Sequence, residues 1–399
     1  MVQASRRGSG VEYAIRDIVV KAEQVKRTGK KITYLNIGDP GRYDFETPVH
    51  IRQALTKAIE NRQNYCSASE GTKELREAIA EKENKLNGAH IDASNVVITQ
   101  GISEAVLFLM GAIVNPGDEV LTPGPCYPPY TSYAKFFDGT PVSYRTIEGQ
   151  GWAPDLEDLK GKITERTRLI VMINPSNPTG SVYSQSEVAR ILEIAAARNI
   201  PVAADEIYDQ IVYDTKFTSA SSIAKETPIF GLNGFSKTYL MTGWRLGYLY
   251  LQDPEGGMRS IWDAIQRMAR VRLCANTPVQ LAGVEALRGP QDHIREMVTK
   301  LRRRRDFSLK RIRNITGFTA ETPEGAFYVF PNVSAVGERW RSDEQFASSL
   351  LEETGVVIVH GSGFDPRYGK GHFRAVFLPE ESILSEAFDL MEGFMKHHA

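Results

Sequence analysis

Residues 228–251 read Pro-Ile-Phe-Gly-Leu-Asn-Gly-Phe-Ser-Lys-Thr-Tyr-Leu-Met-Thr-Gly-Trp-Arg-Leu-Gly-Tyr-Leu-Tyr-Leu, a lysine turn between two apolar runs. The runs 229–232 and 246–251 predict short strands. An amine buried beside a cation such as Arg245 loses its proton more readily than an exposed lysine, whose pKa is about 10.4. It can then form an imine with a carbonyl compound. Lys237 is therefore a candidate nucleophile, although an ordinary surface lysine would explain the pair equally well.

From about residue 94 the chain alternates β-type runs with helical segments. The further predicted strands are Val96–Thr99, Glu119–Thr122, Val142–Arg145, Leu169–Ile173 and Val202–Ala204. Several are continuously apolar, which suits strands covered on both faces. Ser184-Gln-Ser-Glu187 predicts a capping box at the start of a helix. The alternation predicts an α/β fold with a mostly parallel sheet flanked by helices, and active sites in such folds lie at the carboxyl ends of the strands.

At 399 residues the chain is too long for one core, so we expect two domains. Residues 1–47 are predicted to form an N-terminal arm and part of a small domain, residues 48–290 the large cofactor-binding domain, and residues 291–399 a smaller α+β domain. In the last part we expect a basic helix over 300–310 and strands at 325–330, 356–359 and 373–378. The run Arg302–Arg305 is interpreted as a solvated helix face.

Composition narrows the classes of function. The net charge of −1 argues against bulk electrostatic binding of nucleic acid or an anionic membrane. Three cysteines without a Cys-x-x-Cys pair predict reduced thiols in a cytoplasmic protein. The polar, basic N-terminus indicates no signal peptide, and no apolar stretch reaches the length of a membrane span.

Two polar segments follow predicted strands. Asp205-Glu-Ile-Tyr208 places a carboxylate and a phenol three residues apart at the end of a buried strand. The carboxylate could hold a pyridine nitrogen protonated and make the ring an electron sink, and the phenol could bond the oxygen on the ring's third carbon. A metal site at Asp205 and Glu206 is the alternative, but no histidine lies near in the sequence, so we predict no metal. Asn174-Pro-Ser-Asn177-Pro-Thr-Gly180 is a rigid turn whose doubled Asn-Pro suggests asparagines held for a ligand.

Two further segments are weaker signals. In Thr99-Gln-Gly101-Ile-Ser103-Glu104 a glycine precedes the backbone N–H groups of a helix N-terminus, which is an anion site. The aromatic cluster from Tyr127 to Tyr133 offers a stacking face, although such clusters also belong to protein cores.

Asn-Pro-x-Asn-Pro-Thr-Gly, Asp-Glu-x-Tyr and Ser-Lys-(x)7-Arg, in this order, resemble the class I/II aminotransferases. The resemblance implies the fold-type I architecture of pyridoxal 5'-phosphate (PLP) enzymes and runs from Val11 to the last helix. The segments beginning at Tyr13, Leu35, Met268 and Gly371 resemble prokaryotic alanine aminotransferases, archaeal ones especially.

For the ring of PLP, the resemblance implies a role for each of five residues. Lys237 carries the covalent link to the cofactor and shuttles the substrate α-proton. Asp205 pairs with the ring nitrogen, Tyr208 and Asn177 bond the 3-oxygen, and Tyr127 stacks on the ring face.

For the phosphate, the resemblance implies Arg245, Ser236 and the N–H groups of Ile102 and Ser103. Tyr65 matches a tyrosine that reaches the phosphate of a neighbouring subunit, which implies a homodimer with shared active sites. The chain departs from some relatives at Gly234, where they place a phosphate-binding serine.

For the substrate, the resemblance implies that Arg374 clamps the α-carboxylate, with help from the Gly38 main chain and the Asn177 side chain. Arg16 is expected to meet the second carboxylate of 2-oxoglutarate, or else to fix the N-terminal arm by a salt bridge. The implied reaction is ping-pong transfer of the amino group of L-alanine to 2-oxoglutarate.

Other functions stay open at this point. An aspartate or broad-range aminotransferase is the main alternative, and a C–S β-lyase would use the same fold. A regulator would need a DNA-binding module, for which the first ten residues leave no room. A nicotinamide dehydrogenase is disfavoured because no Gly-x-Gly-x-x-Gly opens a strand–helix unit.

Overall fold

The computed structural model describes residues 2–10 and 14–398, so Tyr13 of the N-terminal segment lies outside the described residues. Its main feature is an eight-stranded sheet with the order β2-β9-β8-β7-β6-β3-β4-β5. The strands are β2 (Val96–Thr99), β3 (Glu119–Gly124), β4 (Thr140–Ile147), β5 (Ala153–Pro154), β6 (Thr167–Ile173), β7 (Val202–Asp205), β8 (Ile229–Gly234) and β9 (Gly247–Gln252). Strands β4, β3, β6, β7 and β8 are parallel, whereas β9 is antiparallel to both its neighbours. The predicted strands and the mostly parallel sheet are confirmed.

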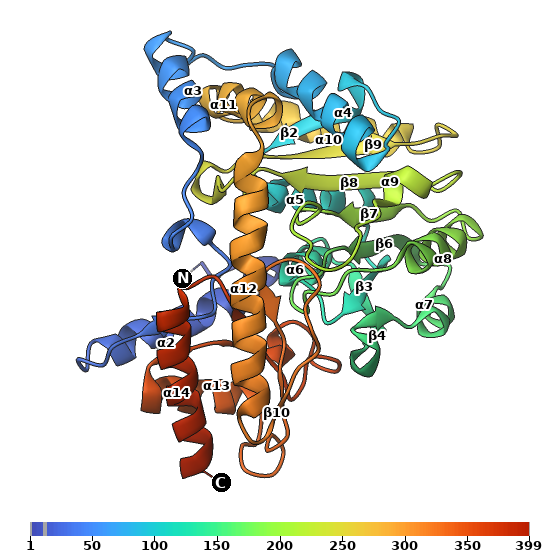
Figure 1. The fold of residues 1–399 in the computed structure, drawn as a ribbon. Helices are drawn as coiled ribbons and strands as arrows, with labels where there is room; N and C mark the ends of the chain where they lie inside the picture. Colours follow the sequence, from blue (N-terminus) through green and yellow to red (C-terminus); the bar gives the residue numbers. More distant parts are fainter. Residues whose placement is uncertain (1, 11–13, 399) are drawn as a thin grey trace.

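Helices cover both faces of this sheet (Figure 1). One face packs against α5 (Ile102–Ile113), α6 (Pro128–Phe136) and α10 (Arg259–Arg272), and the other against α7 (Leu156–Lys162) and α8 (Gln185–Ala196). The predicted capping box at Ser184 starts α8. Near β2 and β9 lie α3 (Val49–Glu60), α4 (Lys73–Asn87) and α11 (Thr277–Arg288), and α9 (Ala220–Ile223) is short. No helix in the described part of the chain has the length and apolar character to cross a bilayer.

A second group of elements gathers around its own core, at the lower end of the long helix α12 (Asp292–Asn314) in Figure 1. It contains the antiparallel sheet β11-β15-β14, built from Tyr328–Val329, Phe373–Val376 and Val359–His360, and the short pair β10 (Phe318–Thr319) and β12 (Asn332–Val333). Helices α13 (Asp343–Thr354) and α14 (Glu381–His397) belong to it. The N-terminal α1 (Arg6–Ser9) leads to α2 (Ala14–Lys26), and β1 (Thr33–Tyr34) pairs in parallel with β13 (Val356–Val357).

Two predictions for this region need correction. The strand expected over 325–330 forms ladder pairs only at Tyr328 and Val329, and Ala326 has a left-handed φ of 55°, which interrupts an extended strand. The solvated face predicted for Arg302–Arg305 was wrong for two of its members. Arg304 and Arg305 are 2% and 4% exposed, because acidic partners compensate their charges. The partners are Asp44 and Asp214 respectively.

Candidate active site

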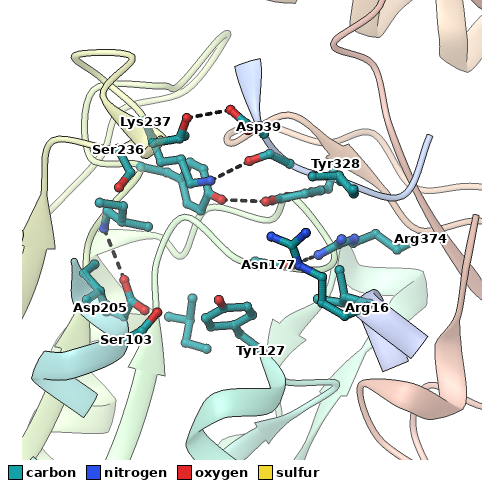
Figure 2. Close-up of a pocket in the computed structure, with 18 of the residues that line it drawn as sticks. Arg16, Asp39, Ser103, Tyr127, Asn177, Asp205, Ser236, Lys237, Tyr328 and Arg374 are labelled. Carbon is teal, nitrogen blue, oxygen red and sulfur yellow. Dashed lines mark hydrogen bonds between the residues drawn. The ribbon is translucent and has the colours of Figure 1, made fainter. Parts of the chain in front are cut away.

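A cavity of about 490 Å³ lies where the carboxyl ends of β6, β7 and β8 meet the second group of elements. All but one of the predicted site residues line it: Arg16, Gly38, Ile102, Ser103, Tyr127, Asn177, Asp205, Tyr208, Ser236, Lys237, Arg245 and Arg374. The exception is Tyr65, which is 61% exposed and does not line the cavity. In Figure 2 Asp205 and Ser103 lie on one side of the cavity, and Arg16 and Arg374 on the other.

Lys237 follows β8 by three residues and sends its amine into this cavity. Nζ donates a 2.6 Å hydrogen bond to the carbonyl oxygen of Gly38 and lies 5.4 Å from the ring centre of Phe327. Burial lowers the pKa of Lys237 to about 8, and the cations Arg374 and Arg245 act in the same direction. Lys237 therefore loses its proton more readily than an exposed lysine does.

Asp205 ends β7 and is 3% exposed. Its Oδ2 accepts a 2.8 Å hydrogen bond from the Tyr130 hydroxyl, and its Oδ1 accepts one of 3.3 Å from the Ile207 N–H. Burial raises the pKa of Asp205 to about 6, although both hydrogen bonds favour the ionised form. A cation placed beside this carboxylate would stabilise its charge.

Arg374 lies in β15, and its side chain is 1% exposed. Its Nη1 donates to Asn177 Oδ1 at 2.7 Å, and its Nη2 donates to the Asn36 carbonyl at 2.6 Å. Nε has no hydrogen-bond partner among the described residues. A buried guanidinium with an unused donor can take up an anionic ligand, because each unpaired polar group inside a protein costs about 1–3 kcal/mol.

The two asparagines of the Asn-Pro turn play different parts. Asn177 reaches the cavity and contacts Arg374. Asn174 instead accepts a 2.9 Å hydrogen bond from the Tyr183 N–H and is wholly buried, so it holds the turn. Of the two asparagines, Asn177 lines the cavity and Asn174 does not, and the Nδ2 of Asn174 is buried without a hydrogen-bond partner among the described residues.

Glycine residues pack closely against the start of α5. A Cβ atom at Gly101 would lie 2.5 Å from Arg245 Nη2, and one at Gly247 would lie 2.9 Å from Ile102 N. The first N–H groups of an α-helix have no partner within the helix, so an anion can bind there beside Arg245. The departure at Gly234 has a local reason, since a Cβ there would lie 2.9 Å from Gly247 Cα.

These features fit PLP, the cofactor that the resemblance implies. The cavity combines an amine of lowered pKa at Lys237, a buried carboxylate at Asp205 and, in Arg245 and the start of α5, a site for a phosphate. Gly101 leaves room at that site which any side chain would fill. Aldehyde, pyridine nitrogen and phosphate thus each have a chemically matched group.

The sequence reasoning missed several residues that complete the site. Tyr130 was considered only as part of a stacking cluster, yet it bonds Asp205. Tyr328 places its hydroxyl 2.7 Å from that of Tyr208. Asp39 accepts a 2.6 Å hydrogen bond from the Thr242 hydroxyl and opposes the lowering of the Lys237 pKa. The only sign in the sequence that Asp39 belongs to the site is its position next to Gly38.

The profile of the family described as aminotransferase class I and II matches residues 30–385. The chain is 36% identical to the glutamate-pyruvate aminotransferase AlaA of Escherichia coli, over 98% of each chain. It is 37% identical to a probable aspartate/prephenate aminotransferase of Aquifex aeolicus, over 87% of each. The solved structure of an alanine aminotransferase from Pyrococcus furiosus superposes with a TM-score of 0.96 at 48% identity, covering 99% of this chain and 100% of that one.

A match over most of the chain, together with relatives of this identity and coverage, shows that the protein belongs to the class I and II aminotransferases, which use pyridoxal 5'-phosphate.

Proposed function

We propose that this aminotransferase moves the amino group of L-alanine to 2-oxoglutarate, giving pyruvate and glutamate. The observation that carries the proposal is the distribution of arginines around the cavity. Of the described arginines that line it, only Arg374 is buried, whereas Arg16 and Arg245 are exposed. One buried arginine suits the α-carboxylate of every substrate. Because no second arginine that the structure describes at the cavity is buried, the site does not demand a second carboxylate and can accept an apolar side chain as small as a methyl group.

The second substrate needs one more positive charge. Arg16 lies in α2 at the edge of the cavity and could reach the distal carboxylate of 2-oxoglutarate while its charge stays in contact with water. Two of the relatives reported above carry glutamate-pyruvate or alanine aminotransferase in their names, which supports the same pair of substrates.

Lys237 is proposed to bind the cofactor covalently and then to act as an acid and base. When bound, PLP supplies an aldehyde that takes up the amino group and a cationic ring that withdraws electrons from the substrate α-carbon. Burial lowers the pKa of Lys237 to about 8, so its amine accepts and releases a proton nearer neutral pH than an exposed lysine would. Arg374 and Asn177 hold the carboxylate end of the substrate, so that this proton faces the amine.

The other lining residues are proposed to hold the cofactor. Asp205 keeps the ring nitrogen protonated, Tyr208 and Asn177 bond the ring oxygen, and Tyr127 covers one ring face. The phosphate binds at Arg245, Ser236, Ile102 and Ser103, all of which line the cavity beside the start of α5.

The test is the visible absorbance of the protein loaded with PLP. We expect L-alanine to remove the band of the lysine-bound cofactor and 2-oxoglutarate to restore it, with Lys237→Ala inactive. A band that L-aspartate removes and L-alanine leaves would replace the alanine assignment by aspartate, a reaction named for the Aquifex aeolicus relative. Pyruvate and ammonia released without a keto acid would indicate a C–S β-lyase instead.

We also propose that the active unit is a homodimer. Tyr65, Val271 and Leu273 are 61%, 87% and 64% exposed, which is unusual for large apolar and aromatic side chains. A second copy that covers them would bring Tyr65 to a neighbouring cavity. Sedimentation of the wild type against Leu273→Glu tests the dimer. Two other predictions stay predictions: the domain boundaries near residues 47 and 290, and a cytoplasmic location.

A further inference from the structure

A buried cluster of charges includes Asp209, the residue that follows Tyr208 in the sequence. Lys82 of α4 contacts the carboxylate of Asp209 and lies 2.8 Å from Glu83 Oε1. The side chains of these three residues are 9%, 2% and 0% exposed. Asn87 donates to Glu83 at 2.7 Å and to Asp209 at 3.0 Å, so it bridges the two carboxylates.

The cluster holds more carboxyl groups than cations. Glu206 is a third buried carboxyl close to Glu83 and Asp209, and burial raises its pKa to about 8, although hydrogen bonds from Ser219 and the Ala220 N–H favour its ionised form. Glu83 and Asp209 are the two carboxylates of the cluster that pair with Lys82, which is the one cation that the structure describes in contact with both. Without it, two anions would face each other in a water-poor interior, which is strongly unfavourable.

Asp209 connects this cluster to the catalytic turn. Its Oδ2 accepts a 2.9 Å hydrogen bond from Asn233 Nδ2 at the end of β8. The Oδ1 of the same asparagine accepts a 2.7 Å hydrogen bond from the Gly234 N–H. Lys237 stands three residues further along, and on the other side Asp209 is the residue after Tyr208. One carboxylate therefore ties together the two segments that carry the proposed site.

We propose that Lys82 is a positioning residue for the active site. By neutralising Asp209, it keeps the Asp209–Asn233 hydrogen bond in place and so holds the Tyr208 segment and the Lys237 turn in register. The inference rests on the proposed roles of Tyr208 and Lys237. It gives a function to a buried lysine that touches neither cofactor nor substrate.

The test compares three variants. Lys82→Met removes the cation, Lys85→Met removes an exposed lysine of the same helix as a matched control, and Lys82→Met/Asp209→Asn removes both charges. The amide oxygen of asparagine at 209 still accepts a hydrogen bond from Asn233, so the double variant keeps the connection and leaves the cluster with the same net charge as in the wild type, that of Glu83.

We expect faster amide hydrogen exchange at residues 206–210 and 233–238 in the cofactor-free Lys82→Met protein. A misplaced lysine turn should also lower kcat about 10- to 100-fold and weaken PLP binding about tenfold, with KM changed less than about threefold. Lys85→Met should match the wild type, and the double variant should recover kcat and PLP affinity to within about threefold.

Two results would overturn the proposal: Lys82→Met behaving like Lys85→Met, or a double variant that keeps the defects of the single one. If Lys82→Met does not fold, the double variant decides alone. A folded, active double variant supports the proposal, and an unfolded or inactive one rejects it. If the wild type binds no PLP, the proposed function fails, yet the exchange comparison still tests Lys82.

Discussion

The amine of Lys237 and the carbonyl oxygen of Gly38 form a 2.6 Å hydrogen bond, which joins the turn after β8 to the N-terminal segment that follows β1. A carbonyl holds the amine in place but offers it no counter-charge. The carboxylates of Asp39 and Asp205 act on Lys237 from beyond direct hydrogen bonds, and they only partly offset the effect of burial. The fold therefore holds the Lys237 amine in position but does not stabilise its protonated form.

The lowered pKa of Lys237 should make the free energy of unfolding of the cofactor-free protein depend on pH. Between about 8 and the ordinary lysine pKa of about 10.4, the unfolded chain binds a proton at Lys237 that the folded chain does not. The free energy of unfolding, measured against Lys237→Met, should therefore rise with pH across this range, by at most about 1.4 kcal/mol per pH unit. Urea unfolding from pH 7 to 10.5 measures it. Exposed Lys225→Met is the control for removing a lysine, and a difference between the wild type and Lys237→Met that does not change with pH would contradict the lowered pKa.

Asp205 should control how PLP affinity depends on acidity. Its pKa is raised to about 6, and only the ionised carboxylate can pair with a cationic ring nitrogen, so wild-type affinity should fall as the pH drops through about 6. Asp205→Asn should lose this dependence and at least about 100-fold in kcat, as expected when a buried charge loses its partner. Fluorescence titration of the cofactor-free protein from pH 5 to 8 is the measurement.

Tyr130→Phe provides the control for that experiment. It removes a hydrogen bond that favours the ionised carboxylate, so the midpoint of the affinity profile should move to higher pH. An unmoved midpoint would mean that Asp205 is not the group that titrates.

Arg374→Lys should weaken the binding of both substrates without weakening the binding of PLP. A lysine ammonium cannot reproduce the guanidinium's planar fork of donors, so we expect KM for L-alanine and for 2-oxoglutarate to rise about 100-fold. The matched control is Arg367→Lys, an exposed arginine seven residues earlier in the chain. Steady-state kinetics and a PLP titration separate the two effects; loss of PLP affinity with unchanged KM would contradict the proposed role.

Arg16→Ala should distinguish the two halves of the reaction. Loss of one partly solvated ion pair should raise KM for 2-oxoglutarate about 3- to 10-fold, while the half-reaction with L-alanine changes little. Single-turnover absorbance changes with each substrate report this directly. An equal effect on both substrates would instead assign Arg16 to anchoring the arm.

Much of this architecture could be read from sequence because the strands of the large sheet are short apolar runs between clear turn signals. Val96–Thr99 was predicted with the bounds that the structure shows. The antiparallel direction of β9 was not predicted, since an apolar run such as Leu246–Leu251 looks the same in either direction. In the second group of elements the strands have two to four residues, too few for a period to establish itself.

The site divides in a similar way. Residues within short motifs, such as Asp205 and Lys237, could be placed together because parallel strands end at one edge of the sheet. The hydrogen bond from Tyr130 to Asp205 joins residues that are 75 positions apart, so no short motif in the sequence indicates it. The burial of Arg304 escaped for the same reason, because its partner Asp44 lies 260 residues away in the sequence.

The hydrogen bond from Arg374 Nη2 to the Asn36 carbonyl spans 338 residues and has a consequence for biosynthesis. During translation the segment around β1 and Asn36 leaves the ribosome long before its partners in β13 and β15 are made. The nascent chain must therefore keep the apolar face of α2 and the unpaired edge of β1 from other contacts until β13 and β15 have been made. Ribosome-bound chains that end before residue 374 should accordingly bind chaperones more strongly than chains that include β15.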